Sequence, residues 1–218
     1  MISVLMPIYN GIEFIDESVS SVLDQTYSDW ELIIGINGHP ENSDVYTIAK
    51  KYEDKAPTKI KVLDLYTIKG KANALNEMVK QCKYDYVAIL DVDDIWVPTK
   101  LEVQSDCLDL YDVIGSQCVY FGEMNGISPS IPFGDISDFD FFSVNPVINS
   151  SSITRKELCY WEENGIEDYD LWLKLRCESR SFFNFTNILV KHRIHKASAF
   201  NSKGTHLKVP DLLQKHRK

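Results

Sequence analysis

Short apolar runs alternate with helix-patterned segments through the first part of the chain. The apolar runs, each of a length that suits a buried strand, cover residues 2–8, 30–36, 59–65 and 86–90. Between them, apolar side chains recur at helical spacing, and these segments are residues 13–25, 44–51 and 71–81. The alternation predicts an α/β fold with a mostly parallel sheet flanked by helices, which binds its ligand at the carboxyl ends of the strands.

The second half of the chain is less regular. Strands are expected at residues 113–121 and 185–193, and a helix at residues 168–176. Residues 122–146, rich in Gly, Pro, Asp and Phe, predict a long loop of the kind that often serves function. The phenylalanines of this loop either line an acceptor surface or pack the loop onto the core, and they are Phe133, Phe139, Phe141 and Phe142. No repeat or linker interrupts the chain, so a single domain is expected.

The charge distribution excludes one class of partner. A formal net charge of -9 argues against nonspecific binding to nucleic acid, which needs a basic face. Beyond Asn201, five basic residues oppose only Asp211. Such a basic tail can dock on an anionic membrane surface, although a frayed, solvated terminus is the expectation here.

The remaining composition points to the cytoplasm. No apolar run is long enough to span a bilayer, and the residues after Met1 read as a buried strand with no basic leader region. The five cysteines include no pair at C-x-x-C spacing, which excludes a zinc ribbon and makes a disulfide framework unexpected. A reducing compartment therefore fits best.

Three aspartates follow the fourth apolar run directly. Alternation along an extended chain places Asp91 and Asp93 on the same side, where two carboxylates form a hard-oxygen site for Mn²⁺ or Mg²⁺. A bound cation of this kind neutralises a diphosphate. The alternative is that Asp94 caps a helix over residues 96–104, with Pro98 in its first turn. Three aspartates in four residues exceed what a cap requires, which favours the metal site.

Two expected helix starts and one strand end carry further polar groups. Lys71 follows Gly70 where a helix begins, and helix N-termini attract anions. Asp168 opens a later helix one turn before Trp172, where a partly buried carboxylate can act as a general base. His195 follows the last strand and can complete a metal shell. Taken singly, each is equally consistent with an ordinary helix start or a surface histidine.

Together, these segments resemble the inverting GT-A glycosyltransferases of family 2. The matching motifs, in family order, are Pro7-Ile8-Tyr9-Asn10-Gly11, Gly70-Lys71-Ala72 with Ala74-Leu75-Asn76, Leu90 to Asp94, Glu167-Asp168 with Trp172, and Arg193-x-His195-x-x-Ser198. The resemblance implies one Rossmann-like domain over residues 1–200, with a nucleotide-sugar half (1–100), an acceptor half (101–200) and a basic tail (201–218).

The resemblance also implies an activity. It is that of a metal-assisted, inverting hexosyltransferase-type enzyme that moves a sugar from a UDP- or GDP-sugar to a glycan or another hydroxyl acceptor. Asp168 would be the general base, and Asp93, Asp91 and His195 would hold Mn²⁺ or Mg²⁺. Glu167 and Trp172 would face the acceptor. The residues that would line the nucleotide-sugar site are Pro7, Ile8, Tyr9, Asn10, Asn37, Lys71, Asn76, Asp91 and Val92.

The sequence departs from the family pattern at one position, and three alternative functions stay open. Where the family usually has D-D-G-S after the second strand, this chain has Asn37-Gly38, so the base preference is unassigned, or the pair forms only a tight turn. An apolar strand ending in D-x-D also resembles aspartate-nucleophile phosphohydrolases, in which Asp91 would attack phosphate. A nucleotidyltransferase would want a glycine-rich basic loop after the first strand, which Asn10-Gly11 does not provide. An inactive nucleotide-binding scaffold of the same fold is the third rival.

Overall fold

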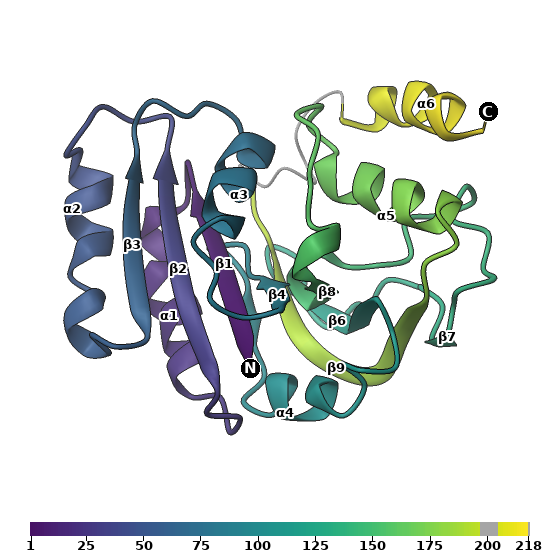
Figure 1. The fold of residues 1–218 in the computed structure, drawn as a ribbon, viewed down its shortest axis with the longest axis horizontal. Helices are drawn as coiled ribbons and strands as arrows, with labels where there is room; N and C mark the ends of the chain where they lie inside the picture. The colour runs from purple at the N-terminus through teal and green to yellow at the C-terminus, as the bar shows by residue number, and fades with distance from the viewer. Residues whose placement is uncertain (197–204, 218) are drawn as a thin grey trace.

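The structure is a computed structural model, which describes residues 1–196 and 205–217. Its first half is a parallel sheet in the order β3-β2-β1-β4 (Figure 1). These strands are β1 (Ile2–Ile8), β2 (Trp30–Asn37), β3 (Ile60–Leu65) and β4 (Tyr86–Ile89). The bounds agree within one residue with the four apolar runs of the sequence, and the predicted α/β fold is confirmed.

The second half extends the same sheet with mixed pairing. β8 pairs antiparallel with both β4 and β6, and β6 pairs parallel with β9. Two short strands, β5 and β7, pair antiparallel with β9. The bounds are β5 (Ile95–Trp96), β6 (Val113–Gly122), β7 (Gly134–Asp135), β8 (Ile153–Arg155) and β9 (Phe182–Ile194). One continuous sheet therefore joins the two halves of the chain.

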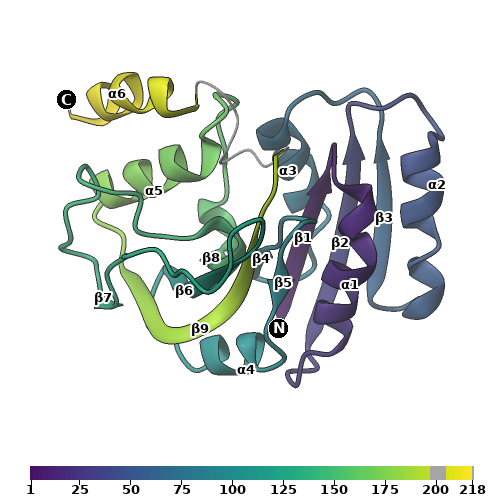
Figure 2. The same ribbon diagram turned by 180° about the vertical axis from the view of Figure 1, so that it is seen from behind.

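Helices cover both faces of this sheet (Figures 1 and 2). The α-helices are α1 (Ile15–Leu23), α2 (Asp44–Lys50), α3 (Lys71–Val79), α4 (Lys100–Ser105), α5 (Glu167–Cys177) and α6 (Thr205–His216). Short 3-10 turns are η1 (Ile12–Phe14), η2 (Glu53–Lys55), η3 (Asn149–Ser151) and η4 (Lys156–Leu158).

The alternation of side chains along β1 explains the two layers. Val4 and Met6 are fully buried in one apolar core, which also contains Val19 of α1. Leu5 points to the other face and is buried in a second core with Leu75 of α3. Because both faces are covered, the strand needs no polar side, and its sequence is a continuous apolar run.

The segment after the acidic cluster differs from its prediction. A helix was expected over residues 96–104 with Asp94 as its cap, but β5 occupies Ile95–Trp96 and α4 begins only at Lys100. The Asp94 side chain accepts hydrogen bonds from β9 instead. A partner almost one hundred positions away in the chain thus replaces the local cap, and the capping alternative is wrong.

The basic tail is ordered where the structure describes it. α6 packs against α5, with Leu212 buried in the second core. Lys215 pairs with Asp170 at 2.9 Å and Lys208 donates to the Asn164 carbonyl at 2.7 Å. The expectation of a frayed terminus is therefore wrong for residues 205–217, because buried apolar contacts and an ion pair hold them. In the part of the chain that is described, no helix combines the length and apolarity that crossing a membrane requires.

Candidate active site

Three polar clusters meet at one edge of the parallel sheet. β1 pairs in register with β2 and with β4, so the carboxyl ends of all three strands lie at the same edge. This edge carries Tyr9 and Asn10 after β1, Asn37 at the end of β2, and the acidic turn from Asp91 to Asp94 after β4. The parallel register of the strands thus brings three polar clusters, far apart in sequence, to one edge of the sheet.

An exposed ring marks the part of this edge near β1 and β2. Tyr9 is 57% exposed, and its ring lies 5.5 Å from that of His39, whose Nε2 contacts the Tyr9 carbonyl at 2.5 Å. Asn10 is also exposed, whereas the side chains of Pro7 and Ile8 are buried within β1. Sequence reasoning did not single out His39, because nothing local distinguishes it from a turn residue.

Asn37 is almost completely buried and turned toward α3. It is 3% exposed, and its Nδ2 donates to the Gly70 carbonyl at 3.3 Å. The next residue, Gly38, has φ +74, and a Cβ there would collide with the Tyr9 ring. Asn37 thus ends β2, and the chain bends at Gly38, whose backbone lies against the Tyr9 ring.

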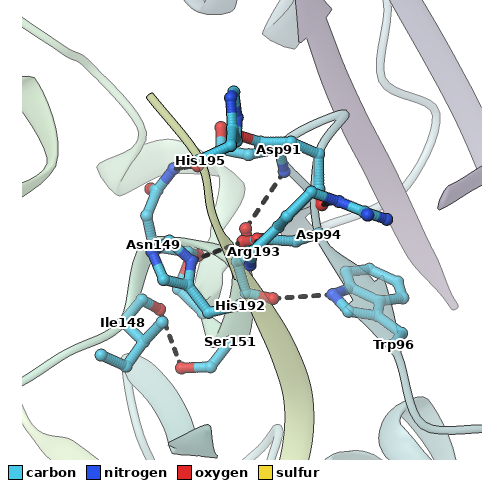
Figure 3. Close-up of polar contacts among 12 residues, drawn as sticks. Asp91, Asp94, Trp96, Ile148, Asn149, Ser151, His192, Arg193 and His195 are labelled. Atoms are coloured by element: carbon cyan, nitrogen blue, oxygen red, sulfur yellow. Dashed lines mark hydrogen bonds and ion pairs between the residues drawn. The ribbon is translucent and has the colours of Figure 1, made fainter. Parts of the chain in front are cut away.

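A lysine–aspartate pair lies at the centre of the edge. Lys71 Nζ is 2.6 Å from Asp91 Oδ1, and Asn149 Nδ2 donates to the other Asp91 oxygen at 3.0 Å (Figure 3). Burial would raise the pKa of Asp91, but the Lys71 charge and these hydrogen bonds lower it below its usual value. Both oxygens of Asp91 are thus engaged by protein groups, and the carboxylate is held ionised.

Lys71 also interacts electrostatically with two further carboxylates, those of Glu167 and Asp168. Burial would lower the pKa of Lys71, but the charges of Asp91, Glu167 and Asp168 raise it above its usual value. Glu167 and Asp168 form the first turn of α5, so the fold brings that helix start against the sheet edge. Lys71 therefore links the acidic turn after β4 with the acidic start of α5, which are far apart in sequence.

Asp168 has the environment of a general base. Burial raises the pKa of its carboxyl above the usual aspartate value, and the Asp91 charge adds to this, although Lys71 opposes it. Asn145 Nδ2 donates to Asp168 Oδ2 at 3.4 Å. Burial likewise raises the pKa of Glu167. A half-buried carboxylate with a raised pKa is suited to accept a proton near neutral pH.

Asp93 and His195 lie together and could hold a cation. Asp93 Oδ2 is 3.0 Å from His195 Nε2. Burial and then the negative charges of Asp94 and Asp91 raise the pKa of Asp93. Among the described residues, no three His, Cys, Asp or Glu side chains are grouped closely enough to hold an ion alone. Mg²⁺ is commonly bound by one or two carboxylates plus substrate phosphates and water, so this carboxylate–imidazole pair fits such a cation.

The turn is tied to β9 by two residues that sequence reasoning did not assign. Asp94 is fully buried and accepts hydrogen bonds from His192 Nδ1 at 3.0 Å and from the Arg193 backbone at 2.9 Å (Figure 3). Burial would lower the pKa of His192, but the Asp94 charge raises it to about 9. Ser198, the last residue of the family-like pattern that includes Arg193 and His195, lies outside the described residues.

Three residues expected at the ligand make structural contacts instead. Trp172 is fully buried in the second core, so the expectation that its side chain faces the acceptor is wrong. Asn76 bonds the backbone of Trp161 twice, Nδ2 to the carbonyl at 2.7 Å and Oδ1 from the amide at 3.0 Å. Its amide therefore fixes a neighbouring loop. Val92 is likewise 6% exposed and lies under Gly11.

The start of α3 is already occupied by a carboxylate of the chain. Glu163 accepts a hydrogen bond from the Ala72 amide at 3.0 Å. The anion expected at this helix start is thus an internal one, supplied from the loop that precedes α5. The loop also supplies the two backbone bonds to Asn76, so it is fastened along α3 on the side next to Lys71.

The phenylalanines of the long loop divide between core and surface. Phe141 is fully buried and Phe133 is 65% exposed, while Phe139 and Phe142 are partly buried against the second core. Phe141 therefore packs the loop onto the domain. Phe133 alone of these four rings faces solvent broadly.

Solved structures with a similar fold identify the architecture. Residues 1–349 of S. aureus TarS in complex with UDP-GlcNAc match 99% of this chain and 66% of that one, with a TM-score of 0.80 at 19% identity. A mannosyltransferase, PcManGT from Pyrobaculum calidifontis in complex with GDP-Man and Mn²⁺, matches 91% of this chain and 58% of that one, with a TM-score of 0.70 at 16% identity. The fold is that of the GT-A glycosyltransferases.

Sequence relatives identify the family. The model of glycosyl transferase family 2 matches residues 3–164. The O-antigen biosynthesis glycosyltransferase WbnJ of Escherichia coli is 31% identical over 220 residues, which cover 93% of this chain and 83% of WbnJ. The chain therefore belongs to glycosyltransferase family 2, and the resemblance drawn from its motifs is confirmed. The phosphohydrolase alternative finds no support in these relatives and structures.

Proposed function

We propose that this chain transfers a sugar from a nucleoside-diphosphate sugar to an acceptor hydroxyl, with inversion at the anomeric carbon and Asp168 as general base. The observation that carries the proposal is the meeting of two acidic segments at Lys71: the turn that holds Asp91, and the start of α5 that holds Asp168. A donor diphosphate at the first segment and an acceptor hydroxyl at the second would be brought together at one edge of the sheet.

The chemical step follows from the charge of each segment. Asp168 takes the proton of the acceptor hydroxyl, and the freed oxygen attacks the anomeric carbon from the side opposite the leaving group. The bond from that carbon to the diphosphate oxygen breaks, and its electron pair leaves with the nucleoside diphosphate. The proton stays on Asp168 until it passes to solvent, and Lys71 balances charge on both sides of the reaction.

A divalent cation fits the same arrangement. Asp93 and His195 would hold Mn²⁺ or Mg²⁺, and Asp91, whose oxygens are engaged by Lys71 and Asn149, would hold it less directly. Such an ion supplies positive charge against the diphosphate as the bond to the sugar breaks. The Mn²⁺ in the PcManGT complex supports this assignment.

The donor side is proposed from the exposed ring at the edge. Tyr9, Asn10 and Asn37 would lie beside the nucleoside, with the Tyr9 ring available for stacking. The bound UDP-GlcNAc and GDP-Man of the two similar structures support a nucleotide sugar, and UDP and GDP donors are both candidates. Glu167 and the loop of residues 122–146 would face the acceptor.

Replacing Asp168 by Asn tests the proposal. Asp168→Asn should lose transfer while a melting-temperature shift with UDP- or GDP-sugar plus Mn²⁺ is kept, because the amide cannot accept the proton but leaves the donor site intact. Glu178→Gln, at the far end of α5, is the matched control and should keep full activity. Transfer retained by Asp168→Asn would rule out the assigned base. Absence of any nucleotide response in the unmodified chain would favour an inactive scaffold.

A further inference from the structure

Arg193 is held rigidly beside the acidic turn. Its guanidinium lies 4.4 Å from the centre of the Phe14 ring and 4.3 Å from that of Phe121, so two aromatic rings contact it. Its Nε donates to the Asp93 carbonyl at 2.8 Å, and it pairs with Glu17 at 2.9 Å. The side chain is 13% exposed. The two ring contacts and a directed N–H bond together hold the guanidinium against the backbone of Asp93.

Asp94 also joins the acidic turn after β4 to the end of β9. Its buried carboxylate binds the Arg193 amide through one oxygen and His192 Nδ1 through the other. Its own amide donates to the Asp91 carbonyl at 3.0 Å, which closes the turn. The backbone of the turn and the end of β9 are thus joined on both sides of Asp93, as the position of these residues in Figure 3 illustrates.

Asp93 and His195, the pair that fits a cation, lie next to these contacts. His195 is two residues past Arg193, and its ring lies 5.1 Å from that of Phe14, the same ring that contacts the arginine. Asp93 is the residue whose carbonyl Arg193 binds. Arg193 therefore contacts the backbone of one member of the pair and shares a packing partner with the other.

We propose that Arg193, together with Asp94, is a positioning residue that sets Asp93 against His195 for cation binding. An arginine at such an edge is otherwise expected to bind the donor diphosphate itself. The inference rests on the proposed metal role of Asp93. It predicts that loss of Arg193 weakens the site for the metal and leaves nucleotide binding without metal intact.

Arg193→Lys tests this, because lysine keeps the charge but has neither the planar fork nor the Nε–H. Mn²⁺ affinity is measured from the free Mn²⁺ signal in electron paramagnetic resonance, at saturating UDP or GDP, whichever stabilises the unmodified chain more. The expected result is binding weaker by about ten- to hundredfold, as for other residues that orient metal ligands. Nucleotide affinity in EDTA should change by less than about twofold, because Arg193 would contact no phosphate.

Arg155→Lys is the matched control. Arg155 is also a half-buried arginine paired with a carboxylate, Asp112, but it lies opposite Tyr86 at the amino end of β4, away from the site. Its variant should bind Mn²⁺ as the unmodified chain does. Should Arg193→Lys not fold, Phe121→Leu removes one stacking ring and leaves the arginine, and it should also weaken Mn²⁺ binding.

Three results overturn the inference, and they are distinguishable. Unchanged Mn²⁺ affinity in Arg193→Lys and Phe121→Leu refutes positioning while leaving the proposed function standing. Loss of nucleotide affinity in EDTA by Arg193→Lys assigns Arg193 to the phosphate. Absence of Mn²⁺ binding by the unmodified chain overturns the metal role itself, and the inference with it.

Discussion

Near the site, Gly70 is the position where adding a single methyl group should lower the free energy of unfolding most. Its backbone, at φ +89 and ψ 149, lies in a region that is essentially restricted to glycine. A Cβ at this position would also lie inside van der Waals contact of the Glu163 carboxylate, which caps α3. Gly70→Ala must therefore strain the backbone and displace the cap.

The size of the effect follows from these two contributions. The strained conformation costs about 1–3 kcal/mol. Loss of the Glu163 cap costs about 1 kcal/mol, within a range of roughly 0.5–2 kcal/mol. Gly70→Ala should then lower the free energy of unfolding by about 2–5 kcal/mol. For a chain of this length each kcal/mol lowers Tm by about 2–4 °C, so a fall of roughly 10 °C is expected.

A double-mutant cycle separates the contributions. The free energy of unfolding in urea is measured for Gly70→Ala, for Glu163→Ala and for the double variant. Because Gly70→Ala already displaces the carboxylate, adding Glu163→Ala should cost almost nothing further, and the two effects should fall short of additivity by about 1 kcal/mol. A Gly70→Ala protein within about 0.5 kcal/mol of the unmodified chain would refute the strain, and strict additivity would refute the contact.

The rate of transfer should fall as pH drops below the raised pKa of Asp168, because the protonated acid is no longer a base. Asn145→Ala should move the midpoint of the pH–rate profile to higher pH, because it removes a hydrogen bond that lowers this pKa. A pH–rate midpoint at or below about 4, the ordinary aspartate value, would contradict this. Trp172→Ala should lower the free energy of unfolding in urea by roughly 3–5 kcal/mol, since the ring is fully buried. Unchanged stability with a raised acceptor KM would restore a role for Trp172 at the acceptor. Lys71→Met should weaken UDP or GDP binding by roughly ten- to hundredfold, measured by calorimetry, and unchanged affinity would restrict Lys71 to its pairing with Asp91.

The first half of the fold is predictable because its signal is local. The strands that end at Ile8 and Asn37 are buried on both faces, so most of their residues are apolar, and the helix that begins at Lys71 shows one apolar stripe. The start of α4 was mispredicted because Asp94 binds His192, a partner that no local window contains. α6 was missed for the same reason, since contacts with α5 hold it in place.

The candidate site was predictable in its residue types more than in their roles. Asp91, Lys71 and Asp168 do converge, because the carboxyl ends of parallel strands share an edge and α5 begins against it. The helical period correctly places Trp172 one turn beyond Asp168, but it does not reveal whether that side of the helix faces solvent or core. Asn149 carries no sequence signal, because its contact with Asp91 depends on how β8 returns beside β4.

The long strand β9 limits how the molecule can move during a catalytic cycle. It pairs with β6 along most of its length, and its end is joined to the turn after β4 through Arg193 and Asp94. A hinge between the two halves would have to break the contacts of β9 with β5 and with the turn after β4, together with the β4–β8 pairing. Opening and closing around substrates is therefore left to the connecting segments, above all residues 123–133, which belong to no helix or strand.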